Sequence, residues 1–133
     1  MKTKKKKAPS LTRLVNSCRK IASELALIRD HYRCLKCGRT KLGGWQIQAS
    51  HIKPKGTYRS MSADVDNIKA LCSMCHRWWH SSPTESGMWF ATTFPEWHQT
   101  LQNRAREAKH WGRSEWQGKL EKLKADDLNA SDE

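Results

Sequence analysis

Four cysteines and a group of histidines are the residues whose types and spacing could do chemistry in this chain. The cysteines form two CxxC pairs, Cys34 with Cys37 and Cys72 with Cys75, and 34 residues separate the pairs. Two thiolates at this spacing can bind one ion in a tight knuckle, and two knuckles complete a tetrahedral four-cysteine zinc site. Gly38 directly follows the first pair and suits the turn. Thioredoxin-like redox chemistry is the alternative for any CxxC motif, but two copies flanking one insert favour a structural zinc ion.

A second candidate centre combines three histidines with an asparagine. Asn67 follows His51 by 16 positions, His76 follows Asn67 by nine, and His80 follows His76 by four. Positions four apart lie on the same face of a helix, so His76 and His80 can bind one metal ion. His51 would face that ion from a preceding strand, and an imidazole suits the role of general base because its unperturbed pKa is near neutrality. Taken singly, each residue also has a structural explanation, as a hydrogen-bonded strand histidine, a turn residue or a helix-end cation.

The charge of the chain favours a polyanionic partner. Lys and Arg total 25 against 13 Asp and Glu, which gives a formal net charge of +12. Each phosphate that a basic side chain neutralises releases condensed counterions, so such an excess favours nucleic acid, with purely non-specific binding as the alternative. Candidate phosphate contacts, which would position a nucleic acid without reading it, are Lys53, Lys55, Arg59, Lys69 and Arg77.

The elements that must position these residues begin with an N-terminal helix. We expect residues 1–9 to form a disordered basic arm, residues 10–124 a single domain and residues 125–133 an acidic flexible tail. Ser10 is the expected N-cap of a helix of about 20 residues. Cys18 lies in the apolar stripe of that helix, so we interpret it as a small buried residue and not as a ligand.

Short-range patterns predict the remaining elements. Residues 45–52 alternate as a strand that places His51 on the same face as the other odd-numbered positions. Residues 72–80 are typical of a turn that runs into a helix. Pro95 opens a further helix, and Ser114 is expected to cap a final short one.

The composition also bears on the compartment. The basic N-terminus is not followed by an unbroken apolar stretch, and no segment is apolar enough to span a membrane. We therefore expect a soluble cytoplasmic protein without a membrane partner, in which cysteines bind metal before they form disulfides. The seven tryptophans are expected to pack in the core or against the knuckles, with stacking of Trp78 and Trp79 on bases as the alternative.

Residues 34–80 resemble the HNH endonuclease family, through the segments CLKCG, ASHIKP and DVDNIKALCSMCHRWWH. His51, Asn67 and His76 correspond to the H, N and H of the family name. The spacing from Asn67 to His76 and His80 is similar to that of colicin-type nucleases, in which two such histidines hold the metal. The CxxC pairs resemble those of zinc-bearing phage and bacterial HNH proteins. A weaker resemblance to NinG-type phage recombination nucleases extends into the helix after Phe94.

The resemblance implies an α+β fold: a small ββα-metal motif stapled by the four-cysteine zinc site and flanked by an N-terminal helix and C-terminal helices. In this motif His51 would take a proton from water, Asn67 would brace the loop that orients His51, and His76 with His80 would hold a catalytic divalent metal. Mg²⁺ or Mn²⁺ is the expected ion, with Ni²⁺ and Zn²⁺ as alternatives. The implied function is a metal-dependent endonuclease that nicks or cleaves DNA, with phage recombination or repair intermediates as candidate substrates.

Ser50 departs from the family pattern, which usually has an Asp or His just before the base as a further metal ligand. A neutral hydroxyl is a poor ligand, so the metal would rest on His76, His80, water and substrate phosphate, and would bind weakly without DNA. This departure supports an alternative function, a non-catalytic zinc-knuckle nucleic-acid-binding protein derived from a nuclease. A zinc scaffold that recruits partners through exposed tryptophans is a third. The sequence leaves a monomer and a homodimer equally open, and we expect surface positions for His31, His98 and His110.

Overall fold

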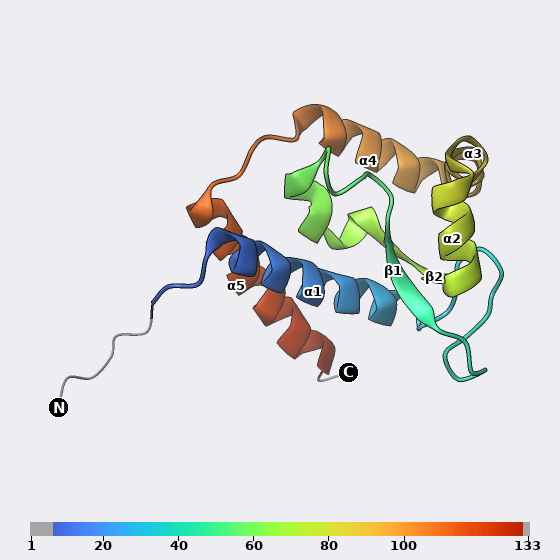
Figure 1. Cartoon of the computed structure of the whole chain (residues 1–133), viewed down its shortest axis with the longest axis horizontal. Coiled ribbons are helices and arrows are strands. Elements are labelled where there is room, and N and C mark those ends of the chain that lie inside the picture. Colours follow the sequence, from blue (N-terminus) through green and yellow to red (C-terminus); the bar gives the residue numbers. More distant parts are fainter. Residues whose placement is uncertain (1–6, 132–133) are drawn as a thin grey trace.

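The computed structural model describes residues 7–131, so the predicted basic arm lies largely outside the described residues. Helices surround one two-stranded antiparallel sheet, which confirms the α+β class (Figure 1). None of the described helices is both long and apolar enough to cross a membrane. The elements in chain order are α1 (Leu11–Arg29), β1 (Ile47–His51), the 3-10 helices η1 (Arg59–Ala63) and η2 (Val65–Asn67), β2 (Ile68–Cys72), α2 (Ser73–Ser81), α3 (Pro83–Thr93), α4 (Pro95–Glu107) and α5 (Arg113–Ser131).

Helix α1 forms where the sequence predicts it, because an N-cap and an apolar stripe coincide. The Ser10 hydroxyl accepts a hydrogen bond from the Arg13 amide at 3.2 Å, which satisfies a donor of the first turn. Cys18 is fully buried in the stripe, as predicted. Helix α5 packs along α1 and completes the largest core cluster with Trp116 and Leu123 (Figure 1).

The sheet and α2 carry the candidate catalytic residues in consecutive order. Strands β1 and β2 pair antiparallel, with His51 opposite Ile68 and Ser50 opposite Lys69. Asn67 lies immediately before β2, and α2 begins directly after it. The chain therefore forms the ββα unit that the resemblance implies.

The C-terminal end of α1 is fixed to β2 by polar contacts. The Asp30 carboxylate accepts a hydrogen bond from the Ala70 amide at 2.9 Å. Arg29 pairs with Asp30 through two nitrogens, at 2.9 and 3.0 Å, and donates to the carbonyls of Val65 and Ile68. These bonds set the position of the sheet relative to the helix that covers it.

Two helices differ from the sequence prediction. The patterns do not predict α3. Its Trp89 packs edge-on against the rings of Trp79 and Phe94, and its Phe90 packs edge-on against Trp79, so tertiary contacts stabilise this segment more than its own propensity does. Helix α5 has 19 residues and is not short. Residues 125–131 are therefore helical, whereas the sequence predicts a flexible tail for this segment.

Candidate functional site

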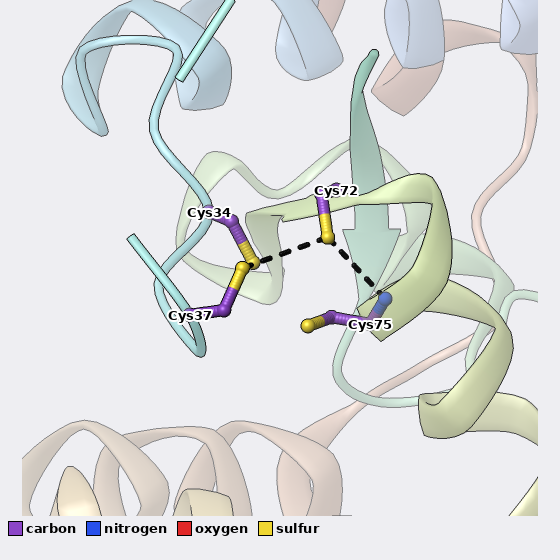
Figure 2. A group of neighbouring side chains, drawn as sticks. All are labelled: Cys34, Cys37, Cys72 and Cys75. Carbon is purple, nitrogen blue, oxygen red and sulfur yellow. Dashed lines mark hydrogen bonds between the residues drawn. The ribbon is translucent and has the colours of Figure 1, made fainter. Parts of the chain in front are cut away.

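The four predicted zinc ligands converge beside the start of α2 (Figure 2). Cys34 and Cys37 come from the loop after α1, Cys72 ends β2, and Cys75 lies in the first turn of α2. Their Sγ atoms all lie within 4.8 Å of one another, and the Sγ atoms of Cys37 and Cys72 are 3.7 Å apart. Four sulfurs about 2.3 Å from a tetrahedral zinc ion are about 3.8 Å apart, so the cluster fits one zinc ion.

Backbone turns hold each pair in its knuckle. Gly38 adopts a φ of 81°, a left-handed conformation that glycine accepts without strain, and its amide donates to the Cys34 carbonyl at 2.9 Å. The Cys75 amide points at Cys72 Sγ from 3.4 Å, so the sulfur caps the first turn of α2. Sequence spacing and local geometry therefore agree at both halves of the cluster.

The surroundings of three of the sulfurs shift their pKa values in different directions. Burial raises the pKa of Cys34 and of Cys75. Burial acts in the same direction on Cys72, but hydrogen bonds from Cys75, Cys37 and Arg39 outweigh it and bring the pKa of Cys72 to about 7. A guanidinium nitrogen of Arg39 lies 3.5 Å from Cys37 Sγ and 3.9 Å from Cys72 Sγ. Four thiolates around Zn²⁺ leave two net negative charges, which Arg39 would partly offset.

His51 ends β1 with its ring fixed by a backbone carbonyl. Its Nε2 lies 2.7 Å from the Ser62 carbonyl oxygen, which can only accept, so Nε2 carries the proton and Nδ1 keeps a free lone pair. Burial lowers the pKa of His51 below its usual 6.5, and the charges of Lys55, Arg19 and Lys69 lower it further against the opposing bond to Ser62. The ring is therefore neutral at pH 7 and can accept a proton.

Asn67 is buried and holds the chain that follows β1. Its Oδ1 accepts from the Lys53 amide at 2.8 Å, and its Nδ2 donates to the carbonyls of Lys53 and Met61, both at 3.1 Å. Met61 directly precedes Ser62, whose carbonyl binds His51. This is the geometry that the bracing role predicted for Asn67 requires.

His76 and His80 present their ring nitrogens to each other on α2. Their Nε2 atoms are 3.1 Å apart, a separation that suits two nitrogens each about 2.0–2.1 Å from one metal ion. The His76 Nδ1 lies 2.7 Å from the Gln48 side-chain oxygen, so Nδ1 donates and Nε2 is left as the ligand atom. Burial, followed by the charge of His80, lowers the pKa of His76 to about 4. Gln48 is not among the predicted site residues, although it lies on the strand predicted to carry His51.

Ser50 and Lys69 are fully buried and face each other across the sheet. The Lys69 Nζ donates to the Ser50 hydroxyl at 3.2 Å and lies 3.2 Å from the centroid of the Trp79 ring. Burial lowers the pKa of Lys69 well below its usual value, against the opposing charges of Asp30 and Cys34. The Ser50 hydroxyl, which stands where the family usually has a further metal ligand, therefore already has Lys69 as a hydrogen-bond partner. The sequence predicts that Lys69 contacts phosphate, but its side chain lies in the interior of the protein.

One pocket of about 550 Å³ collects the three histidines of the predicted centre, His51, His76 and His80. Two predicted phosphate contacts, Lys53 and Lys55, line the same pocket, whereas Arg59 and Arg77 are exposed and do not line it. His98, expected on the surface, lines the pocket from α4. No local sequence pattern marks His98, because it lies far outside the histidine motif. The rest of the lining comprises Ala49, Ile52, Pro54, Gly56, Trp79, Pro83, Ser86, Gly87 and Phe90.

Comparison with known families agrees with this arrangement. Residues 34–82 match the family model described as HNH endonuclease. This segment is thus similar to an HNH nuclease domain, a class that implies nucleic acid as substrate, and it includes the four clustered cysteines and the predicted histidines. Neither the comparison with curated proteins nor that with solved structures gave a match.

Proposed function

We propose that the protein is a metal-dependent endonuclease that hydrolyses DNA phosphodiester bonds, with His51 as the general base. One observation carries the proposal: His51, His76 and His80 line one pocket, and Ser62 and Gln48 fix the tautomers of two of these rings. Those tautomers leave Nδ1 of His51 free to accept a proton and Nε2 of His76 free to bind an ion. A structural role alone would not require either lone pair.

In the proposed reaction, Nδ1 of His51 takes a proton from a water molecule as the water oxygen attacks phosphorus in line. The bond from phosphorus to the 3′-oxygen breaks, which gives a 5′-phosphate and a 3′-hydroxyl that takes its proton from solvent. The Ser62 carbonyl accepts from Nε2 throughout and stabilises the imidazolium that forms. A divalent ion held by His76 and His80 would supply positive charge for the leaving oxygen.

The rest of the pocket supports binding of a phosphodiester chain. Lys55 is exposed at the pocket, and Lys53 lines it with its ammonium donating to Gln102 of α4. Because the Ser50 hydroxyl accepts a hydrogen bond from Lys69, the ion would have two imidazoles, those of His76 and His80, as its protein ligands among the described residues. Such a site would bind its ion weakly until substrate phosphate completes the shell, with Mg²⁺ or Mn²⁺ first and Ni²⁺ or Zn²⁺ next among ions to test.

Plasmid nicking tests the proposal directly. Supercoiled DNA is incubated with zinc-loaded protein and Mg²⁺, Mn²⁺ or Ni²⁺, and the wild type is compared with His51→Ala and with His110→Ala, a matched change at an exposed histidine. We expect His51→Ala to nick at least about 100-fold more slowly, the usual contribution of a general base, and His110→Ala to match the wild type. No nicking with any of the metals, or equal nicking by a folded His51→Ala variant, would refute the enzymatic function.

A second candidate function is a nucleic-acid-binding protein without catalysis. The contact between Ser50 and Lys69 favours it, since the Lys69 side chain engages the hydroxyl at the position of the usual third ligand. Salt-sensitive DNA binding without nicking would establish this alternative.

The weaker resemblance to phage recombination nucleases makes branched DNA intermediates the first substrates to compare with plain duplex.

A further inference from the structure

Part of the pocket that contains the three histidines is built by residues outside the HNH domain. The family match ends at residue 82, and α3 and α4 lie beyond it. Their contribution to the lining consists of Pro83, Ser86, Gly87, Phe90 and His98. We call these five residues the α3–α4 wall. The wall belongs to this chain's own architecture, and the proposed hydrolysis assigns it no part.

Packing holds the α3–α4 wall in place. Phe90 is 1% exposed and contacts the rings of Phe94, Trp97 and His98 at centroid distances of 5.5, 5.1 and 6.3 Å. One helical turn after His98, Gln102 accepts a hydrogen bond from Lys53 of the loop after β1. The wall and the loop that follows His51 are thus joined, and the pocket between them is preformed.

The pocket is larger than the proposed hydrolysis requires. Its volume is about 550 Å³, within the range of about 300–1,000 Å³ that small-molecule sites occupy. A metal ion with its waters and one phosphate group fills the space of several water molecules, each about 30 Å³ in the liquid. Room remains for a further group of the size of a nucleobase.

The lining matches the two halves of a nucleotide. Trp79, which is half-buried, offers aromatic surface, and half-buried Ile52 adds aliphatic surface, which suits the flat face of a base. Lys53 and Lys55 offer cationic groups in the same pocket, which suits a phosphate. A base paired inside a duplex is stacked on both sides, so only an unpaired or extruded base can enter such a pocket.

We propose that the α3–α4 wall, together with Trp79, binds one unpaired nucleotide of the DNA strand next to the scissile phosphate. The base lies against Trp79 and Ile52, and its phosphate lies towards Lys53 and Lys55. The location of the scissile phosphate rests on the proposed function, whereas the binding of the nucleotide does not require cleavage. The protein therefore prefers DNA with an unpaired nucleotide over fully paired duplex.

Gly87 allows the pocket to be filled without disturbing the core. It is half-buried on α3 and lines the pocket, and a Cβ added there would meet no atom within 4 Å. Gly87→Leu places a branched side chain at the pocket and also raises helix propensity, so the variant has no intrinsic reason to unfold. Gly118→Leu is the matched control, because Gly118 is exposed on α5 with equally open space around it.

The test is fluorescence anisotropy with labelled duplexes and zinc-loaded protein, without added Mg²⁺ or Mn²⁺. The three probes carry a single bulged adenosine, an abasic site at the same bulge, or no bulge. We expect wild type and Gly118→Leu to bind the adenosine bulge about tenfold more tightly than the abasic one, which is typical of one stacked base. Gly87→Leu should bind these two probes within about twofold of each other.

Equal binding of the adenosine and abasic bulges by the wild type would overturn the proposal. A preference that survives unchanged in Gly87→Leu would overturn it as well, because the nucleotide would then lie elsewhere. A protein that shows the preference but never nicks DNA would refute the proposed hydrolysis and leave the nucleotide site standing. A protein that nicks DNA without this preference would refute the nucleotide site and leave the proposed hydrolysis standing.

Discussion

At the scale of single residues, two neutral acceptors determine what the imidazoles can do. The Ser62 carbonyl holds the proton of His51 on Nε2, and the Gln48 side-chain oxygen holds the proton of His76 on Nδ1. The two rings therefore present different atoms to the pocket, Nδ1 in one case and Nε2 in the other. The two histidines look alike in the sequence, but the hydrogen-bond partner of each ring gives them different roles.

Replacing Gln48 should weaken metal binding without removing a ligand. In Gln48→Leu the Nδ1 proton of His76 loses its acceptor, so we expect Mn²⁺ affinity in the presence of DNA to fall about tenfold or more. Gln48→Glu should retain or increase the affinity, because a carboxylate accepts the same bond. Isothermal titration with Mn²⁺ measures both, with the exposed Gln46→Leu as control. Equal affinity for Gln48→Leu and Gln46→Leu would contradict this assignment.

The environment of His51 sets the pH dependence of nicking. The base must be neutral to act, and burial places its pKa below 6.5. At saturating metal, the single-turnover rate should therefore rise with pH in the acid range and reach half of its plateau value below pH 6.5. A rate–pH profile measured from pH 4.5 to 8 checks this expectation. A rate that keeps climbing tenfold per pH unit above pH 7 would show that a different group limits the reaction.

At the scale of elements, the cysteine cluster joins the loop after α1 to the junction of β2 and α2. Cys34 and Cys37 approach from one side, and Cys72 and Cys75 supply the other. Cys72 has two functions there, since its sulfur also caps α2. Zinc would consequently fix the first turn of the helix that carries His76.

Loss of zinc should loosen this junction before the contact between α1 and α5. We expect Cys37→Ser to lose its zinc and to lower the melting temperature by about 10 °C or more, since each kcal/mol shifts a domain of this size by several degrees. The matched variant Cys18→Ala removes a buried thiol outside the cluster and should retain one zinc ion per chain. Zinc content by atomic absorption, together with thermal unfolding, distinguishes the two. A Cys37→Ser protein that keeps full zinc and full stability would refute the four-cysteine site.

At the scale of the whole molecule, the formal net charge of +12 acts on any polyanion before a specific contact forms. Exposed Lys55 lies at the pocket itself, whereas exposed Lys124 lies on α5, which packs against α1 (Figure 1). The long-range attraction due to the net charge and the local contact of Lys55 with phosphate can therefore be separated by experiment.

Salt dependence makes this separation. The logarithm of the DNA association constant should fall linearly with the logarithm of salt concentration, and Lys55→Ala should reduce the magnitude of the slope by about one. Lys124→Ala removes the same charge away from the pocket and should leave the slope nearly unchanged. Anisotropy titrations between 50 and 300 mM NaCl measure both variants. Equal slopes for Lys55→Ala and wild type would place the phosphate path away from the pocket.

The sequence by itself determined the features that depend on short spacing. The CxxC pairs predicted the cysteine cluster, the cap at Ser10 predicted the start of α1, and the histidines four apart predicted the facing rings on α2. Each CxxC knuckle, the cap and the facing rings follow from helix or turn geometry over a few residues, whereas the meeting of the two knuckles requires the fold between them.

Only the tertiary structure decided which distant residues surround the site. The pairing of Lys69 with Ser50, the contact of Gln48 with His76 and the contact of Lys53 with Gln102 join positions 19, 28 and 49 apart. Lys69 was expected on the surface and is buried against Trp79, because β2 is covered on the face where that side chain points. Helix α3 and the position of His98 likewise depend on aromatic packing between helices, which spacing along one segment cannot encode.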